Sequence, residues 1–170
     1  DIVAQMHTHE VVLLHGVTSS GKTEVYIHLI ARALEQGQQV LYLLPEIALT
    51  VQMMDRLRRV FGSRLGIYHS KYSDAERVEI WKKQLSDHPY DVILGARSAV
   101  FLPFRRLGLV VVDEEHETSF KQQDPAPRYH ARSVAIMLAH LSGARTLLGT
   151  ATPSAESYHN ALTGKFGLVR

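Results

Sequence analysis

The sequence has no cysteine, no long apolar run and little net charge. Without cysteine, a disulfide scaffold, a Cys-ligated zinc site and a thiol nucleophile are excluded. No apolar run approaches the ~18–20 residues that a membrane-spanning helix needs, so we expect no membrane association. The first residues, Asp1-Ile2-Val3-Ala4-Gln5, lack both an initiator methionine and the charged-then-apolar pattern of a signal peptide. We therefore expect a piece of a longer cytosolic protein.

Charge is nearly balanced overall but uneven along the chain. Nineteen Lys and Arg face seventeen Asp and Glu, which leaves a net charge of +2. The net charge is −3 over residues 1–50, +5 over 51–112, −4 over 113–120 and +4 over 121–170. This alternation is compatible with ordinary solvated faces. It is also compatible with an acidic cation site between basic surfaces that meet a polyanion.

Short apolar runs alternate with stretches of helical periodicity, and 45% apolar content is enough for a sizeable core. The six runs that we interpret as strands are Val11–Leu14, Val40–Leu44, Gly66–Tyr68, Asp91–Gly95, Leu109–Asp113 and Thr146–Gly149. Strands that are apolar at successive positions are typical of a parallel sheet covered by helices on both faces. The alternation therefore predicts a doubly wound α/β domain with three α/β/α layers.

One intervening helix has a clear start signal. Ser73 and Glu76 have the spacing of a capping box, which predicts a helix beginning directly after Ser73. We expect this helix to turn Val78, Trp81 and Leu85 toward the core.

The strongest chemical signal is a phosphate-binding motif between the first strand and the following helix. Its residues are Gly16, Val17, Thr18, Ser19, Ser20, Gly21, Lys22 and Thr23, which match G-x-x-x-x-G-K-[ST]. The glycines let the backbone fold into a nest of N–H groups that binds anions. We expect Lys22 to reach the β- and γ-phosphates of a nucleotide and the Thr23 hydroxyl to bind Mg²⁺.

A second signal is the acidic segment Asp113-Glu114-Glu115-His116, which follows four buried hydrophobic residues. Open α/β sheets bind ligands at the carboxyl ends of their strands. We expect Asp113 to hold Mg²⁺ and Glu114 to orient or deprotonate the attacking water. Adjacent carboxylates beside a phosphate site are costly without a divalent cation, which implies Mg²⁺. The alternative is an acidic cap for the next helix.

A third signal, Gly149-Thr150-Ala151-Thr152-Pro153, follows the sixth strand. The hydroxyls of Thr150 and Thr152 could bond the carboxylate–histidine cluster and sense the γ-phosphate. The alternative is simple helix capping by Thr152 before Pro153.

The three motifs together resemble the first, RecA-like lobe of superfamily 2 helicases. Further stretches resemble the bacterial replication-restart helicases, the primosomal protein N-prime family. These stretches are Glu24-Val25-Tyr26, Pro45-Glu46-Ile47-Ala48-Leu49-Thr50, Tyr68-His69-Ser70, Arg97-Ser98-Ala99 and Tyr129-His130-Ala131-Arg132. The resemblance implies a lead-in over residues 1–10, a RecA-like ATP-binding lobe over 11–164, and over 165–170 the start of a linker to a second lobe.

The resemblance also implies an activity. It implies an ATP- and Mg²⁺-dependent 3′-to-5′ DNA helicase that remodels stalled replication forks and primes primosome assembly. The implied partners are forked DNA with single-stranded and duplex parts, a second RecA-like lobe of the same parent chain, primosome proteins and single-strand-binding protein. The implied location is the bacterial cytoplasm, associated with the nucleoid. Zinc is implied only in parts of the parent protein outside this chain.

Two groups of residues are candidates for DNA phosphate contacts. The first is Pro45, Glu46 and Thr50, at the start of a helix whose backbone N–H groups could bind a phosphate. The second is Arg97 and Ser98, which follow the next strand of the sheet. Ordinary loop capping is the alternative for both groups.

The polar segment from Ser119 to Arg132 suits single-stranded nucleic acid, since aromatic rings stack on bases while cations follow phosphates. The candidate DNA contacts there are Phe120, Lys121, Tyr129, His130 and Arg132. The resemblance implies that such a loop couples DNA binding to hydrolysis, and we expect His116 and Arg128 to act with the two threonines in this coupling. Alternatively, the aromatic rings only anchor a surface loop.

Two rival functions remain open from the sequence. One is the lobe of another superfamily 2 translocase, and the other is a non-catalytic, nucleotide-dependent DNA-binding module. In superfamily 2 an arginine finger from the second lobe completes the hydrolytic site, and such a residue contributes roughly 10³–10⁵ in rate. We therefore expect this chain alone to bind nucleotide and DNA weakly and to turn over little ATP.

Overall fold

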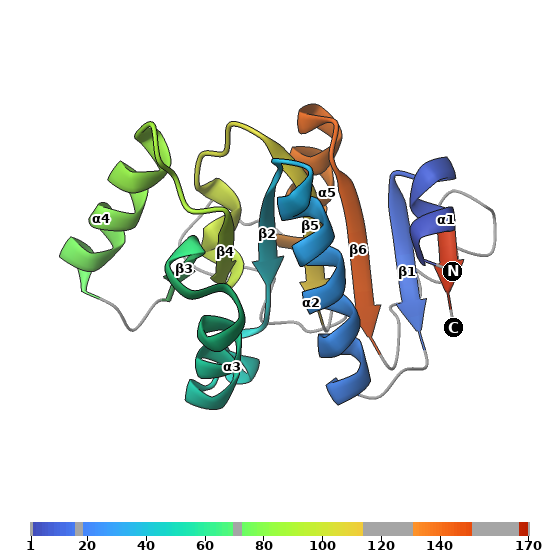
Figure 1. The fold of residues 1–170 in the computed structure, drawn as a ribbon, viewed down its shortest axis with the longest axis horizontal. Coiled ribbons are helices and arrows are strands. Elements are labelled where there is room, and N and C mark those ends of the chain that lie inside the picture. Colours follow the sequence, from blue (N-terminus) through green and yellow to red (C-terminus); the bar gives the residue numbers. More distant parts are fainter. Residues whose placement is uncertain (1, 16–18, 70–72, 114–130, 151–166, 170) are drawn as a thin grey trace.

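The computed structural model describes residues 2–15, 19–69, 73–113, 131–150 and 167–169 (Figure 1). Of the candidate catalytic, binding and coupling residues named above, those outside the described ranges are Gly16, Val17, Thr18, Glu114, His116, Phe120, Lys121, Arg128, Tyr129, His130 and Thr152.

The centre of the molecule is a seven-stranded sheet in the order β3-β4-β2-β5-β6-β1-β7, and all of its strand pairs are parallel. The strands are β1 (Val11–His15), β2 (Gln39–Leu43), β3 (Leu65–Tyr68), β4 (Val92–Gly95), β5 (Leu107–Asp113), β6 (Arg145–Thr150) and β7 (Gly167–Val169). The parallel α/β prediction and all six expected strands are confirmed. β7 could not be predicted, because its three residues are too few to show a periodic pattern.

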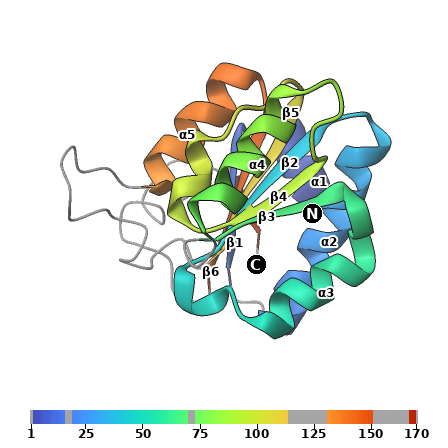
Figure 2. The ribbon, with the colours of Figure 1, turned by 90° about the vertical axis from the view of Figure 1, so that its left-hand side faces the viewer.

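Helices cover both faces of this sheet (Figure 2). The α-helices are α1 (Ile2–Thr8), α2 (Ser19–Glu35), α3 (Val51–Phe61), α4 (Asp74–Leu85) and α5 (Ala131–Ser142), and the short 3₁₀ helices are η1 (Glu46–Ala48), η2 (Gly62–Arg64) and η3 (Arg97–Phe101). α1, α2 and α3 pack on one face, and α4, η3 and α5 pack on the other. None of the described helices has the length and apolarity to cross a membrane.

Two apolar clusters, one on each face of the sheet, explain the continuous apolar runs. Along β1, Val12 and Leu14 point into the cluster under α2, whereas Val11 and Leu13 point into the cluster under α5. Successive side chains of a strand alternate between faces, so a strand covered on both faces is apolar at every position. These central strands form the buried middle layer of the fold.

The chain outside residues 11–164 also adds to the described fold. α1 packs against β1 and β7, and β7 pairs with β1 in parallel. The domain bounds inferred from the sequence stay a prediction.

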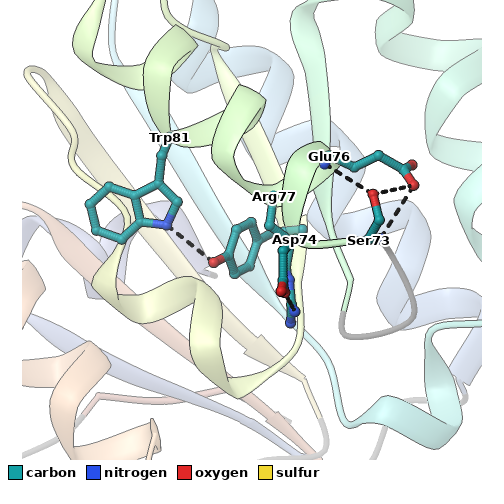
Figure 3. Close-up of polar contacts among 6 residues, drawn as sticks. Ser73, Asp74, Glu76, Arg77 and Trp81 are labelled. Carbon is teal, nitrogen blue, oxygen red and sulfur yellow. Dashed lines mark hydrogen bonds and ion pairs between the residues drawn. The ribbon is translucent and has the colours of Figure 1, made fainter.

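The capping box at the start of α4 is confirmed (Figure 3). The Ser73 hydroxyl accepts a hydrogen bond from the Glu76 backbone N–H at 3.2 Å. In return, the Glu76 carboxylate accepts one from the Ser73 backbone N–H at 3.2 Å. These two bonds satisfy N–H groups that the first helical turn leaves without an intrahelical partner.

The expected inward face of α4 is wrong for two of its three residues. Val78 and Leu85 are 46% and 62% exposed, whereas Ile80 and Gln84 are buried. The helix is rotated relative to the prediction, because the Gln84 side chain faces inward. Its amide donates a hydrogen bond to the Pro103 carbonyl and accepts one from the Tyr90 backbone N–H. Trp81 is half-buried and donates its indole N–H to the Tyr68 hydroxyl at 3.1 Å (Figure 3).

Candidate nucleotide and nucleic-acid site

The sheet brings the three sequence motifs to one edge. β5, β6 and β1 are neighbours, and the register pairs Asp113 with Gly149 and His15 with Thr150. All three strands run in the same direction, so their carboxyl ends lie together. Ligands of open α/β sheets bind at this edge.

The described part of the phosphate-binding motif forms the first turns of α2. The helix begins at Ser19, four residues after β1 ends, so Gly21, Lys22 and Thr23 lie near its N-terminus. The first four N–H groups of a helix lack intrahelical acceptors and carry partial positive charge. No acidic side chain stands in this first turn, so the turn has the electrostatics of an anion site. For Ser19 and Ser20 only the backbone is described.

Lys22 and Asp113 form a buried ion pair. The Lys22 ammonium lies 3.3 Å from Oδ1 of Asp113, and the residues are 1% and 8% exposed. Taking a charge out of water is costly unless an opposite charge compensates it. The pair therefore joins the phosphate-binding motif to the acidic motif, 91 residues apart in the sequence.

Tyr26 is a site residue for which sequence reasoning gave no role. Its hydroxyl donates a hydrogen bond to Oδ1 of Asp113 at 2.9 Å, and the side chain is fully buried. Tyr26 stands four residues after Lys22 on α2, and residues with this spacing lie on one helix face. The helical spacing alone could have placed Tyr26 beside Lys22, but not against a strand end 87 residues away.

Thr23 and Asp113 line a shared cavity of about 320 Å³. The other lining residues are Leu44, Ala48, Thr50, Gln52, Met53 and Arg56. Hydroxyl and carboxylate oxygens are the ligands that Mg²⁺ prefers, usually together with water and substrate phosphates. The two residues predicted to hold Mg²⁺ therefore fit the ion in chemistry and in placement.

The two candidate DNA segments lie next to each other at the same edge, after β2 and β4, on the side of β5 away from β6. Pro45 is the N-cap of η1, and Glu46 is the first residue of that helix. Thr50 caps α3, because its side-chain oxygen accepts a hydrogen bond from the Met53 backbone N–H at 3.1 Å. A hydroxyl that accepts one bond still has its proton to donate to an anion.

The second DNA segment follows β4, the strand paired with β2. Arg97 and Ser98 begin η3 and are half-buried. The backbone N–H of Leu44, one residue past β2, donates to the Gly95 carbonyl at 3.0 Å. This bond keeps the two loops side by side. Thr150 ends β6 and Arg132 lies in α5, and neither side chain is described.

Comparison with known proteins identifies the family. The sequence pattern of the DEAD/DEAH box helicases matches residues 1–161. The chain belongs to the DEAD/DEAH box helicase family.

Among curated relatives, the chain is similar to replication restart protein PriA from several bacteria. It is 47% identical to the protein of Chlamydia pneumoniae over 98% of this chain and 22% of the relative. It is 45% identical to that of Bacillus subtilis (strain 168) over 95% of this chain and 20% of the relative. The chain thus spans about a fifth of the length of these relatives.

Solved structures match the fold at lower identity. A structure of RecG bound to a three-way DNA junction superimposes with a TM-score of 0.62 at 23% identity, covering 94% of this chain and 20% of that one. The crystal structure of T4 UvsW gives 0.62 at 20% identity, covering 95% and 31%. These likenesses confirm the RecA-like, three-layer α/β/α fold class.

Proposed function

We propose that the chain is the ATP-binding lobe of a 3′-to-5′ DNA helicase that remodels stalled replication forks and primes primosome assembly. The observation that carries this proposal is the buried contact between Lys22 and Asp113 at the carboxyl edge of the sheet. The similarity to replication restart proteins over nearly the whole chain supports the biological setting. The resemblance supports the polarity, the primosome and single-strand-binding protein partners, and the bacterial nucleoid as location.

Each residue of the nucleotide site has a distinct task in the proposed hydrolysis. The amides at the start of α2 bind the phosphates, and Lys22 neutralises their negative charge. Thr23 and Asp113 would hold Mg²⁺, which when bound would stabilise the negative charge on the transferred phosphoryl group. Glu114, the residue after Asp113, orients or deprotonates the attacking water.

The lysine must change partners during this cycle. With Asp113 at 3.3 Å, its charge is already compensated inside the protein. Lys22 would then pair with the negative charge of bound nucleotide phosphates, and Asp113 would pair with the positive charge of bound Mg²⁺. When nucleotide and metal bind together, the buried charges of Lys22 and Asp113 both keep an opposite charge as a partner. When only one of them binds, one buried charge loses its partner, so joint binding is favoured over separate binding.

The DNA side of the proposal rests on the adjacency of η1 and η3. The start of α3, the Thr50 hydroxyl and the Arg97 guanidinium together offer donors for two neighbouring backbone phosphates. Thr23 of the nucleotide site and Thr50 of the first DNA segment line the same 320 Å³ cavity. A shift of α3 on DNA binding would therefore change the shape of the cavity that Thr23 and Asp113 line. We propose that His116, Arg128, Thr150 and Thr152 complete this coupling.

We expect Arg97→Ala, made in the complete helicase that carries this lobe, to weaken DNA binding without changing nucleotide binding. Losing one phosphate contact flattens the dependence of log K on log salt by about 0.7 if the contact is to a single strand and about 0.9 if it is to duplex. Fluorescence anisotropy of a labelled fork across a salt series measures this slope.

The matched control is Arg59→Ala, which removes the same charge from an exposed position near the other end of α3. It should leave the salt slope at the wild-type value. Equal slopes for Arg97→Ala and the wild-type protein would remove Arg97 from the DNA surface.

A further inference from the structure

Tyr26 occupies the point where the three nucleotide motifs meet. It projects from α2, its ring is fully buried, and its hydroxyl bonds Oδ1 of Asp113 at the end of β5. The ring also packs edge-on against Tyr42 of β2, with centroids 5.5 Å apart and planes at 78°. The position of the hydroxyl is therefore fixed by packing as well as by its hydrogen bond.

The third motif makes room for this hydroxyl. A Cβ atom added at Gly149 would lie 1.5 Å from the Tyr26 hydroxyl and 3.2 Å from Oδ1 of Asp113. No side chain larger than a hydrogen fits there while Tyr26 keeps its place. The Tyr26 side chain therefore explains why this position is a glycine. Gly149 lies directly before Thr150, one of the threonines proposed to act in coupling.

The hydrogen bond constrains how Asp113 presents its carboxylate. Rotation about the terminal bond of an aspartate is soft and roughly two-fold, so an unbonded carboxylate samples a broad range. Oδ1 of Asp113 accepts from Tyr26 and also faces Lys22. When Lys22 turns to nucleotide phosphates, the Tyr26 bond still restrains Oδ1 of Asp113.

We propose that Tyr26 is a positioning residue that orients Asp113 for Mg²⁺ and ties it to the β6 strand end. This inference rests on the proposed function, because it requires Asp113 to hold the metal. Groups that orient a metal ligand affect metal affinity or activity by roughly 10–100-fold when removed. Tyr26→Phe removes one oxygen and keeps the ring, so its effect should be confined to the metal.

The test is a Mg²⁺ titration of fluorescent ADP binding to the 170-residue chain, with each variant first checked for cooperative melting. We expect Tyr26→Phe to need about 10-fold more Mg²⁺ for half-maximal binding. Its affinity for the same nucleotide in EDTA should equal that of the wild-type chain. Tyr42→Phe is the matched control, because it removes the same atom from the adjacent buried ring and leaves the Tyr26–Asp113 bond in place; its Mg²⁺ requirement should be unchanged.

The outcomes separate this inference from the proposed function. If the wild-type chain binds no nucleotide with or without Mg²⁺, the proposed function fails. If the wild-type chain binds and Tyr26→Phe has the same Mg²⁺ requirement, only the role of Tyr26 fails. An equal loss of affinity in Mg²⁺ and in EDTA, or loss of cooperative melting, also overturns the inference, since either result shows a packing role instead.

Discussion

Lys22→Ala should abolish the stabilisation that Mg·ATP gives to the wild-type chain. A ligand at about 100 times its Kd stabilises a protein by about 2.7 kcal/mol. For a domain of this size, this corresponds to a rise in Tm of about 5–10 °C. The variant lacks the ammonium group that compensates the phosphates, so its Tm should not move when Mg·ATP is added. Differential scanning fluorimetry with a nucleotide titration measures the effect.

Two further variants keep this result interpretable. Removing one partner of a buried ion pair costs about 3–5 kcal/mol, because the remaining charge is left uncompensated. Lys22→Met fills more of the vacated space, and it should also lose the response to nucleotide. Lys83→Ala removes a charge that lies over the Tyr90 ring, 5.0 Å from its centroid, and should keep the full response. A normal rise in Tm with both Lys22 variants would refute the nucleotide site.

The isolated chain should hydrolyse ATP roughly 10³–10⁵ times more slowly than the complete helicase, because an arginine finger contributes this factor. In the proposed enzyme that arginine comes from the second lobe. Arg56 of α3 lines the cavity beside Thr23 and Asp113, but it is engaged in an ion pair with Glu24. A steady-state phosphate-release assay, with and without forked DNA, measures both proteins under the same conditions.

The complete helicase with Glu114→Gln sets the background for this comparison, since that change removes the proposed base. The isolated chain should lie near this background whether DNA is present or absent. DNA-stimulated turnover by the isolated chain at a rate close to that of the complete helicase would contradict the two-lobe account.

Much of the fold could be predicted because the informative residues are local. The run Leu109–Asp113 is apolar up to its final carboxylate, which marks both a buried strand and its end. Parallel strands end at one edge, so a motif after each strand could be placed there without knowing the strand order. The Lys22–Asp113 contact agrees with that reasoning.

The remainder depends on contacts that no local pattern encodes. The strand order separates β1 from β2 by β5 and β6, and only this order makes Asp113 and Gly149 neighbours. The hydrogen bond from Tyr26 joins residues 87 positions apart in the sequence. It also needs the space left by Gly149, and a glycine does not show in the sequence which side chain it makes room for. The pattern of apolar residues does not predict which face of α4 points inward, because the buried Gln84 is held there by hydrogen bonds of its polar side chain.

The most direct test of the nucleotide site is to map where Mg·ADP binds. Amide chemical shifts of the ¹⁵N-labelled chain, followed during a titration, report each residue separately. The site at the carboxyl edge predicts the largest shifts at Gly21, Lys22, Thr23 and Asp113. A larger cavity of about 640 Å³ lies elsewhere, between α3, α4 and β3, and its lining includes Lys82. Shifts confined to that cavity, with the start of α2 and the end of β5 unchanged, would contradict the account.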